Sequence, residues 1–277
     1  MTTVVHTRAE FAAARAALAG PVGLVPTMGA LHAGHAALLD QARKDCASVV
    51  ATIFVNPTQF GPNEDLAKYP RTLETDLAIC DKAGVDVVWA PTGGDVYPGG
   101  DPAVTLAPGL IGAELEGAVR PTHFAGVLTV VAKFFAIVRP DRAYFGEKDY
   151  QQLTLIRQMA HDLDMGVDVV GVPTVRERDG LALSSRNVYL SATDRARALT
   201  LSRALRAGRD AAEDGGGAAQ VLDAATTVLG EEPDIAVDYL ALRSADLGPA
   251  PAHGAARLLV AARVGSTRLI DNVAVEL

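Results

Sequence analysis

Two histidines three positions apart, His32 and His35, follow an apolar run in a segment that also carries Gly29 and Gly34. Glycine permits a sharp turn and a close approach of backbone amides to an anion. A helix that begins near His35 would add its positive N-terminal end to the same place. The segment therefore predicts a docking site for nucleotide phosphates, and an enzyme that acts on ATP.

The glycine spacing is that of a Walker phosphate loop, but His35 stands in the place of the lysine and Ala36 in the place of the magnesium-binding hydroxyl. Three interpretations of the histidine pair remain: a zinc pair, two structural histidines, or two imidazoles directed at phosphate oxygens. Zinc needs a third ligand, and the other histidines are scattered without cysteine or acidic partners at ligand spacing. The sequence favours imidazoles directed at phosphate.

Two further segments carry cations beside other polar groups. Lys148 lies between an expected strand and an expected helix, where it is able to meet a phosphate, and Asp149 next to it is either a helix N-cap or a partner for a ribose hydroxyl. Arg186 follows two serines in a polar stretch, which is either a solvated turn or a phosphate-binding loop. One cation at about 4 Å from a phosphate contributes roughly 4 kcal/mol at an effective dielectric constant of 20, so a triphosphate needs several such groups.

Two glutamines, Gln59 and Gln152, follow expected strands and bring uncharged amides to the same edge of the expected sheet. Each alone is more often an ordinary surface amide. Their common location favours recognition of hydroxyl or carboxylate oxygens.

The elements that position these residues alternate between strand and helix through the first part of the chain. A capping box at Thr7 and Glu10 opens a short helix, and the later apolar runs and helical periodicities follow one another in turn. This alternation predicts a mostly parallel sheet covered on both faces, with ligands at the carboxyl ends of its strands. Strands are expected at residues 22–25, 48–55, 85–89, up to 145 and 167–170, and helices at 35–44, 73–82, 124–138 and 150–163.

The remainder of the chain has a different pattern. Helices are expected at residues 193–212 and up to 229, and three β-rich stretches at 235–242, 257–264 and 268–275 are spaced as in a small antiparallel sheet. We therefore predict an α/β protein with two domains. A Rossmann-like domain of residues 1–172 is expected to bind the nucleotide, and a smaller α+β C-terminal domain of residues 173–277 is expected to carry a mobile phosphate-contacting loop.

The composition excludes several classes of protein. A formal net charge of −8 over 277 residues argues against general binding to nucleic acid or to anionic membranes. No apolar stretch has the length of a membrane span, and the first residues lack a targeting pattern, so a cytoplasmic protein is expected. Cys46 and Cys80 lack metal or redox spacing and are expected to be reduced and partly buried.

Six ordered motifs spread over almost the whole chain closely resemble the pantothenate synthetase family, pantoate–β-alanine ligases of the nucleotidyltransferase superfamily that carries the histidine signature. The motifs are Pro26-Thr27-Met28-Gly29-Ala30-Leu31-His32-x-Gly34-His35, Phe54-Val55-Asn56-Pro57-x-Gln59-Phe60, Tyr69-Pro70-Arg71, Arg120-Pro121-x-His123-Phe124-x-Gly126-Val127, Phe145-Gly146-Glu147-Lys148-Asp149-Tyr150-Gln151-Gln152 and Ser184-Ser185-Arg186-Asn187.

The resemblance implies ATP-dependent joining of pantoate to β-alanine through a pantoyl adenylate, with release of pyrophosphate and AMP, by a homodimer. It implies that Gln59 and Gln152 bind pantoate, that Gln59 also lies next to β-alanine, and that His35 is the catalytic histidine. His32, Lys148 and Arg186 are expected to assist it. The ATP site is expected to contain Met28, Gly29, Ala30, Leu31, His32, Ala33, Gly34, His35, Gly146, Glu147, Lys148, Asp149, Val175, Leu183, Ser184, Ser185 and Arg186.

Two positions depart from the family pattern. Leu183 stands where methionine is common, a change of small consequence because both are apolar and of similar volume. The acidic cluster near a proposed magnesium site is thin, so magnesium is expected to arrive with ATP, its protein ligands are left open, and Asp76 is a candidate contact. The alternatives are a related adenylate-forming enzyme with another acid substrate and a non-catalytic ATP-sensing protein.

Overall fold

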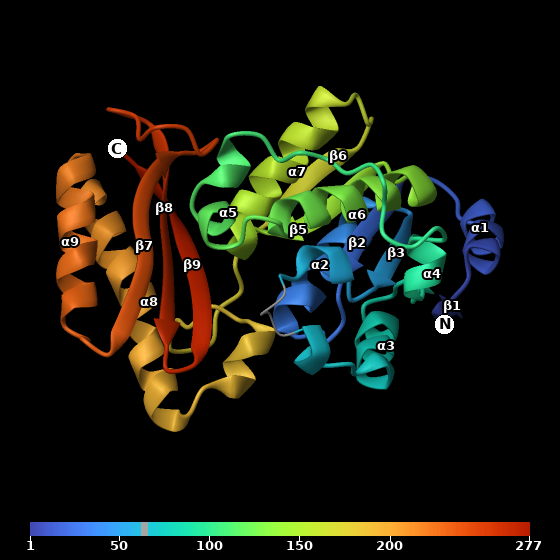
Figure 1. Ribbon diagram of the computed structural model, residues 1–277, viewed down its shortest axis with the longest axis horizontal. Helices are drawn as coiled ribbons and strands as arrows, with labels where there is room; N and C mark the ends of the chain where they lie inside the picture. The colour runs from blue at the N-terminus through green and yellow to red at the C-terminus, as the bar shows by residue number, and fades with distance from the viewer. Residues whose placement is uncertain (62–65) are drawn as a thin grey trace. The chain divides into compact units, whose positions relative to one another are not determined.

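The computed structural model describes residues 1–61 and 66–277 (Figure 1). Its contacts divide the chain into two compact units. The first unit consists of Met1–Glu147 and Gln151–Pro173, and the second of Lys148–Tyr150 and Thr174–Leu277.

The first unit is built on a six-stranded sheet in which all paired strands are parallel, so the predicted α/β class is confirmed. The strand order is β1-β4-β3-β2-β5-β6. The strands are β1 (Thr3–Val5), β2 (Val22–Thr27), β3 (Ser48–Ile53), β4 (Val87–Trp89), β5 (Arg142–Gly146) and β6 (Asp168–Val172). The sequence did not predict β1, because its three residues are too few to show a periodicity.

The longer helices of this unit agree with those predicted to within a few residues. They are α1 (Arg8–Ala16), α2 (Ala33–Asp45), α3 (Leu73–Lys82), α6 (His123–Val138) and α7 (Tyr150–Asp162), and the short helices α4 (Gly93–Val96) and α5 (Glu116–Val119) lie in the connections. The capping box of α1 is present, since the Thr7 hydroxyl accepts from the amide of Glu10 and the Glu10 carboxylate accepts from the amide of Thr7. Short 3-10 turns are η1 (Pro57–Gln59), η2 (Leu66–Lys68), η3 (Ile111–Ala113) and η4 (Glu147–Asp149).

Helices cover both faces of the parallel sheet. On one face, Leu39 of α2 and Cys80 of α3 pack with Val25 and Val88 of the sheet. On the other face, the ring of Phe11 in α1 stacks on Trp89 at 4.8 Å between centroids, and Phe134 of α6 meets the same tryptophan. Full burial on both faces explains why these strands are continuous apolar runs rather than alternating ones.

The order in which strands are added to the sheet reverses at β2. From β2 the chain continues to β3 and β4 on one side, whereas β5 and β6 are added on the other side of β2. The loops after β2 and β5 therefore leave neighbouring strands at the point where the order reverses. Open parallel sheets bind ligands at this point, outside the carboxyl ends of the strands.

The second unit contains the antiparallel sheet that the sequence predicted. Its strands pair in the order β7 (Ile235–Ser244), β8 (Ala255–Val264) and β9 (Thr267–Glu276), and its helices are α8 (Ala192–Glu213) and α9 (Ala218–Gly230). Gly208 of α8 lets the helix approach the sheet, because a Cβ atom there would lie 2.5 Å from Leu258 Cδ2. Among the described helices of the whole chain, none combines the length and apolar content needed to cross a bilayer.

Candidate functional site

The turn after β2 has an unusual backbone, with Gly29 at φ +83° and Ala30 at φ +51°. Glycine adopts this region readily, whereas alanine does so only under strain. A Cβ atom on Gly29 would lie 3.0 Å from Asp76 Oδ2 and 3.3 Å from Ile53 Cγ2. The turn is thus packed closely against β3 and α3, and glycine is required at position 29 for both reasons.

The carboxylate of Asp76, in the first turn of α3, binds the backbone of this turn. Its Oδ2 accepts from the Ala30 amide at 3.1 Å and its Oδ1 accepts from the Leu31 amide at 2.8 Å. The hydroxyl of Thr72 donates to Oδ1 at 3.1 Å. The backbone amides of Ala30 and Leu31 are therefore bound within the protein, because the carboxylate of Asp76 accepts from both of them.

Each histidine of the pair accepts a backbone amide through Nδ1. His32 is the N-cap of α2, where its Nδ1 accepts from the Gly34 amide at 3.1 Å. His35 Nδ1 accepts from the His32 amide at 3.3 Å, and the two ring centroids lie 4.2 Å apart. A Cβ atom on Gly34 would lie 2.8 Å from His32 Cε1, so the folded-back ring needs glycine there.

This hydrogen bonding fixes the tautomer of both rings. A neutral imidazole whose Nδ1 accepts a hydrogen bond carries its proton on Nε2. His32 and His35 are therefore Nε2–H donors, which suits hydrogen bonds to phosphate oxygens. Ala33, the first residue of α2, starts the helix two residues earlier than expected, so the positive helix end lies at the histidine pair itself.

The turn after β3 carries Gln59 beside the buried side-chain amide of Asn56. Asn56 is 1% exposed, and its Nδ2 donates to Gln59 Oε1 at 3.1 Å and to the Gly126 carbonyl at 3.2 Å. Tyr97 donates its hydroxyl to Asn56 Oδ1 at 2.9 Å. Gln59 Nε2 in turn donates to Met28 Sδ at 3.2 Å. The residues that follow β2 and β3 are thereby brought together, as the sequence predicts for Met28 and Gln59.

Gly126 in α6 permits this arrangement. A Cβ atom there would lie 2.2 Å from the Thr58 carbonyl oxygen and 2.6 Å from the Gln59 amide nitrogen. The Gln59 carbonyl also accepts from His123 Nδ1 at 2.9 Å. Asn56, His123 and Gly126 belong to motifs quoted above, but their burial and contacts depend on helix packing that no local pattern reveals.

The loop after β5 begins with Gly146, the last residue of the strand, and Glu147, the first residue of η4. Gln152 is half-buried in the first turn of α7. Its neighbour Gln151 is buried and structural: Oε1 accepts from the Glu116 amide at 3.0 Å, and Nε2 donates to the Ile111 carbonyl at 2.7 Å. Adjacent glutamines thus have different environments, a distinction that the sequence alone does not contain.

Lys148 and Asp149 belong by their contacts to the second unit. Lys148 Nζ lies 3.9 Å from Asp149 Oδ2, and the Lys148 carbonyl accepts from Asn272 Nδ2 at 2.9 Å. The Tyr150 hydroxyl donates to the Ala245 carbonyl at 2.8 Å, and the guanidinium of Arg257 lies 3.8 Å from the centre of its ring. The antiparallel sheet and its β7 end therefore hold this short segment.

The predicted residues 175 and 183–186 lie together within the second unit. The Leu183 amide donates to the Val175 carbonyl at 3.0 Å, which closes a short hairpin. Ser184 caps the 3-10 turn η5 (Ser185–Tyr189), since its hydroxyl accepts from the Arg186 amide at 3.2 Å. The hairpin is tied to β9 by Arg176, which forms a bidentate pair with the buried Asp271 at 2.6 and 2.8 Å.

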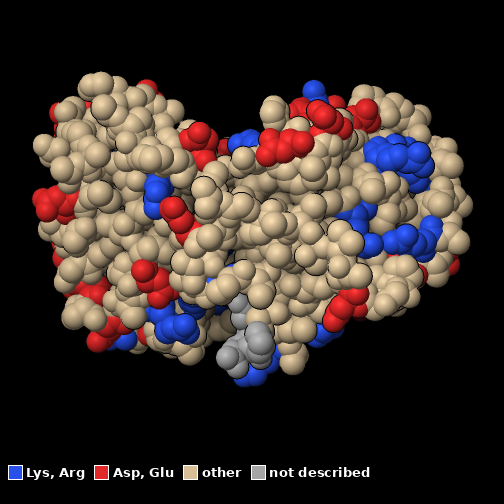
Figure 2. Space-filling view, turned by 45° about the horizontal axis from the view of Figure 1, so that its top comes forward, with Lys and Arg blue, Asp and Glu red and all other residues tan. Residues whose placement is uncertain are grey.

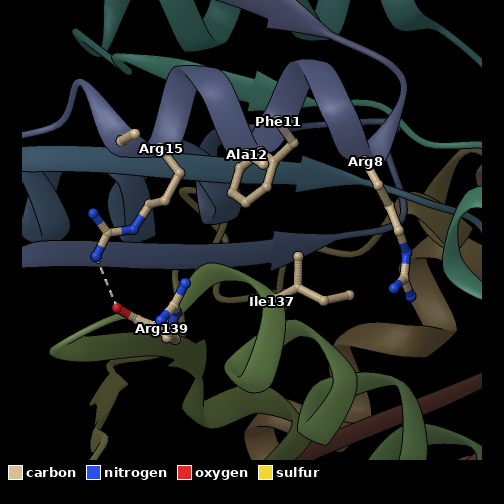
Figure 3. A pocket seen from close by; sticks show the side chains of 7 residues that line it. Arg8, Phe11, Ala12, Arg15, Ile137 and Arg139 are labelled. Carbon is tan, nitrogen blue, oxygen red and sulfur yellow. Dashed lines mark hydrogen bonds between the residues drawn. The ribbon is translucent and has the colours of Figure 1, made fainter.

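A separate cavity of about 540 Å³ lies along α1 and the end of α6 (Figure 3). Two of its arginines bind carbonyl groups at the ends of helices: Arg8 donates to the Val96 carbonyl at 3.2 Å, and Arg15 donates to the Val138 carbonyl at 2.7 Å. Figure 2 shows basic side chains gathered over this part of the first unit. The cavity shares no residue with the predicted site, and the guanidinium groups of Arg8 and Arg15 have a structural explanation. The lining residues are Arg8, Phe11, Ala12, Arg15, Ala16, Ile137 and Arg139.

No set of three His, Cys, Asp or Glu side chains within residues 1–61 and 66–277 is grouped as a metal site requires. Asp76, the candidate magnesium contact, has both oxygens bound to the chain's own donors.

Comparisons with known proteins agree on one family. The family model described as pantoate-beta-alanine ligase matches residues 1–274. A relative from Salinispora arenicola named pantothenate synthetase is 60% identical over 100% of this chain and 99% of its own length. One of the same name from Mycolicibacterium smegmatis is 63% identical over 91% of this chain and 80% of its own length.

Solved structures agree in fold as well. Pantothenate synthetase from Thermus thermophilus superposes with a TM-score of 0.92 at 52% identity, covering 98% of this chain and 99% of that one. A pantoate-beta-alanine ligase from Francisella tularensis, complexed with beta-gamma ATP and beta-alanine, gives a TM-score of 0.82 at 35% identity, covering 99% and 97% of the two chains.

Proposed function

The chain belongs to the pantoate–β-alanine ligase family, and on this premise we propose that it condenses pantoate with β-alanine using ATP. A carboxylate does not react with an amine at neutral pH, because oxide is a poor leaving group. Attack of the pantoate carboxylate on the α-phosphorus forms a pantoyl adenylate and expels pyrophosphate. The β-alanine amine then attacks the pantoyl carbonyl, and AMP departs.

The observation that most supports this proposal is that the loops carrying the proposed site residues follow neighbouring strands of the sheet. The histidine turn and the Gly146 loop follow β2 and β5, the neighbouring strands at which the sheet order reverses. The Gln59 turn follows β3, on the other side of β2. ATP and pantoate bound here would meet at the carboxyl edge of three adjacent strands.

In the adenylation step, His32 and His35 donate Nε2–H hydrogen bonds to phosphate oxygens, on which charge accumulates. Donors fixed in direction before the reaction stabilise such charge without reorganising, and the loss of one typically costs a factor of about 100 to 1,000 in kcat. The Nδ1 acceptors at the backbone amides supply that fixed direction. Neither ring acts as a nucleophile.

Residues of the second unit complete the proposed ATP site on the strength of the family resemblance. Lys148 and Arg186 supply cations to the triphosphate, and Ser184 and Ser185 supply hydroxyl donors. Ser184 accepts the Arg186 amide and so keeps its own proton available for donation. The full proposed set is Met28, Gly29, Ala30, Leu31, His32, Ala33, Gly34, His35, Gly146, Glu147, Lys148, Asp149, Val175, Leu183, Ser184, Ser185 and Arg186.

Pantoate is assigned to Gln59 and Gln152. The hydrogen bond from Asn56 to Gln59 Oε1 orients this amide, so its Nε2 donor faces Met28 at the end of β2. Gln59 also lies beside the place proposed for β-alanine. No side chain is assigned as the base of the amine step, and the proton leaves to solvent.

Magnesium is proposed to enter as the complex of ATP, and no protein ligand is assigned to it. No step of the mechanism is routed through a protein-bound ion. The family resemblance also supports a homodimer and a cytoplasmic location.

Omission of one substrate at a time tests the function. Pantoate alone is expected to drive exchange of label between pyrophosphate and ATP, and AMP release is expected to need β-alanine as well. Exchange driven by another acid but not by pantoate would indicate a related adenylate-forming enzyme. Tight ATP binding without exchange or turnover would indicate an ATP sensor.

A further inference from the structure

One buried carboxylate, that of Asp76, binds the backbone of the turn that carries the two histidines. It is 1% exposed, and it lies in the first turn of α3, where the positive helix end favours a negative charge. We infer that Asp76 is a positioning residue that sets the shape of the turn carrying His32 and His35, and that it is not a magnesium ligand.

Asp76 binds the turn at the residues whose backbone conformation is least regular. The two oxygens accept from the amides of Ala30 and Leu31, at 3.1 and 2.8 Å. Gly29 and Ala30 both have positive φ, and alanine needs outside support to stay there. The carboxylate of Asp76 provides that support, because it binds both amides and keeps them close together. A fully extended backbone would separate the two amides.

The shape of this turn then determines where the imidazoles point. Leu31 immediately precedes His32, whose extended backbone makes it the N-cap of α2. The ring of His32 then folds back onto the Gly34 amide, and His35 receives the His32 amide. A change in the direction of the Leu31 peptide therefore changes both Nδ1 hydrogen bonds and, with them, the two Nε2–H directions.

The same contacts argue against coordination of magnesium by Asp76. Thr72 donates a third hydrogen bond, to Oδ1 at 3.1 Å, so three of the roughly four acceptor positions of the carboxylate are in use. Magnesium keeps several of its water molecules and demands near-octahedral geometry. A carboxylate that is almost completely buried and already bound to three donors does not meet that demand.

The test compares Asp76→Asn with Glu74→Gln, which neutralises an exposed carboxylate in the same turn of α3. Asparagine accepts at one position only and presents an N–H group to the other amide. With Asp76→Asn we expect kcat/KM for ATP to fall by about tenfold or more, whereas the magnesium concentration for half-maximal rate stays within about twofold of the wild type. Glu74→Gln should change neither value.

A second readout is independent of catalysis. In the ligand-free protein with EDTA, the imidazole 15N shifts of His32 and His35, assigned from single His→Gln variants, should show the Nε2–H tautomer. In Asp76→Asn they should move toward a mixture of tautomers. Unchanged shifts would overturn the inference, and so would a loss of activity that excess magnesium restores.

Thr72→Val keeps the test decisive if Asp76→Asn does not fold. It removes only the hydroxyl donor to Oδ1, and we expect kcat/KM for ATP to fall by about threefold with the same direction of 15N change. Unchanged shifts in this variant would likewise overturn the inference. The inference rests on the proposed function only for the expected change in kcat/KM for ATP. A wild-type chain without pantoate-dependent activity would refute the proposed function. The 15N shifts would then decide the role of Asp76.

Discussion

His32 and His35 use Nδ1 to hold the backbone of their own turn, and this sets what their Nε2 atoms are able to do. A ring that donates from Nε2 stabilises a phosphate oxygen, whereas a general base must offer a bare nitrogen to a proton. The hydrogen bonds at Nδ1 therefore favour charge stabilisation over proton abstraction. Residue types and spacing predicted this role, but the direction of the rings depends on an acidic residue 45 positions away from Leu31.

At the residue scale we predict that His35→Ala lowers kcat by about 100- to 1,000-fold, because one aimed donor to the reacting phosphate is lost. His161→Ala is the matched control, since His161 is exposed at the end of α7. Steady-state rates with all three substrates saturating provide the measurement. A His35→Gln enzyme with near-normal turnover would exclude the role assigned to His35.

A thiol in the core gives a prediction with a defined pH dependence. Burial, followed by the nearby charge of Asp76, raises the pKa of Cys80 to about 12. Below about pH 9 the thiol is neutral in both the folded and the unfolded chain, so it adds no pH dependence there. Between about 9 and 12 only the unfolded chain ionises, and the free energy of unfolding falls by about 1.4 kcal/mol per pH unit from this group.

Cys80→Ala removes this dependence. The difference in free energy of unfolding between wild type and Cys80→Ala should therefore shrink as the pH rises from about 9 to about 10.5, in urea titrations under reducing conditions. A difference that stays constant over this range would show that the thiol ionises in the folded protein as readily as in the unfolded one.

At the scale of elements, the contact between α6 and η1 positions Gln59. Gly126 is the residue that allows the helix and the turn to meet backbone to backbone. The Asn56 amide then bridges the two, because it donates both to the Gly126 carbonyl and to Gln59. Two elements far apart in the sequence thus orient one proposed pantoate-binding side chain.

We predict that Gly126→Ala destabilises the protein by about 1–3 kcal/mol, the typical cost of overpacking. Because the displaced atoms belong to the turn of Gln59, KM for pantoate should rise more than KM for ATP. Gly93→Ala is the control, since a Cβ atom there meets nothing within 4 Å. Equal changes in both KM values would argue that the α6–η1 contact has no special part in binding pantoate.

At the scale of the whole molecule, the sequence predicted the alternating strands and helices and the C-terminal antiparallel sheet, because long buried runs and helical periodicities carry strong signals. It missed β1, which is three residues long and depends on pairing with β4. It also missed the buried roles of Asn56 and Gln151 and the contact of Asp76 with the histidine turn. Each of these depends on partners distant in the chain, which no local pattern specifies.

The assembly state is a prediction of the same scale. We expect sedimentation equilibrium to give a mass twice the 28.8 kDa of the chain, since the family resemblance implies a homodimer. The measurement should cover a range of protein concentrations. A single species with the mass of one chain throughout that range would contradict this expectation.

The central claim is that the chain activates the pantoate carboxylate as an adenylate. Pantoate labelled with 18O in both carboxylate oxygens tests it directly, by mass spectrometry of the products. The carboxylate oxygen that attacks the α-phosphorus leaves with AMP when the amine attacks, so the account predicts one 18O in AMP and one in the pantothenate amide. Unlabelled AMP, or label in inorganic phosphate instead, would contradict it.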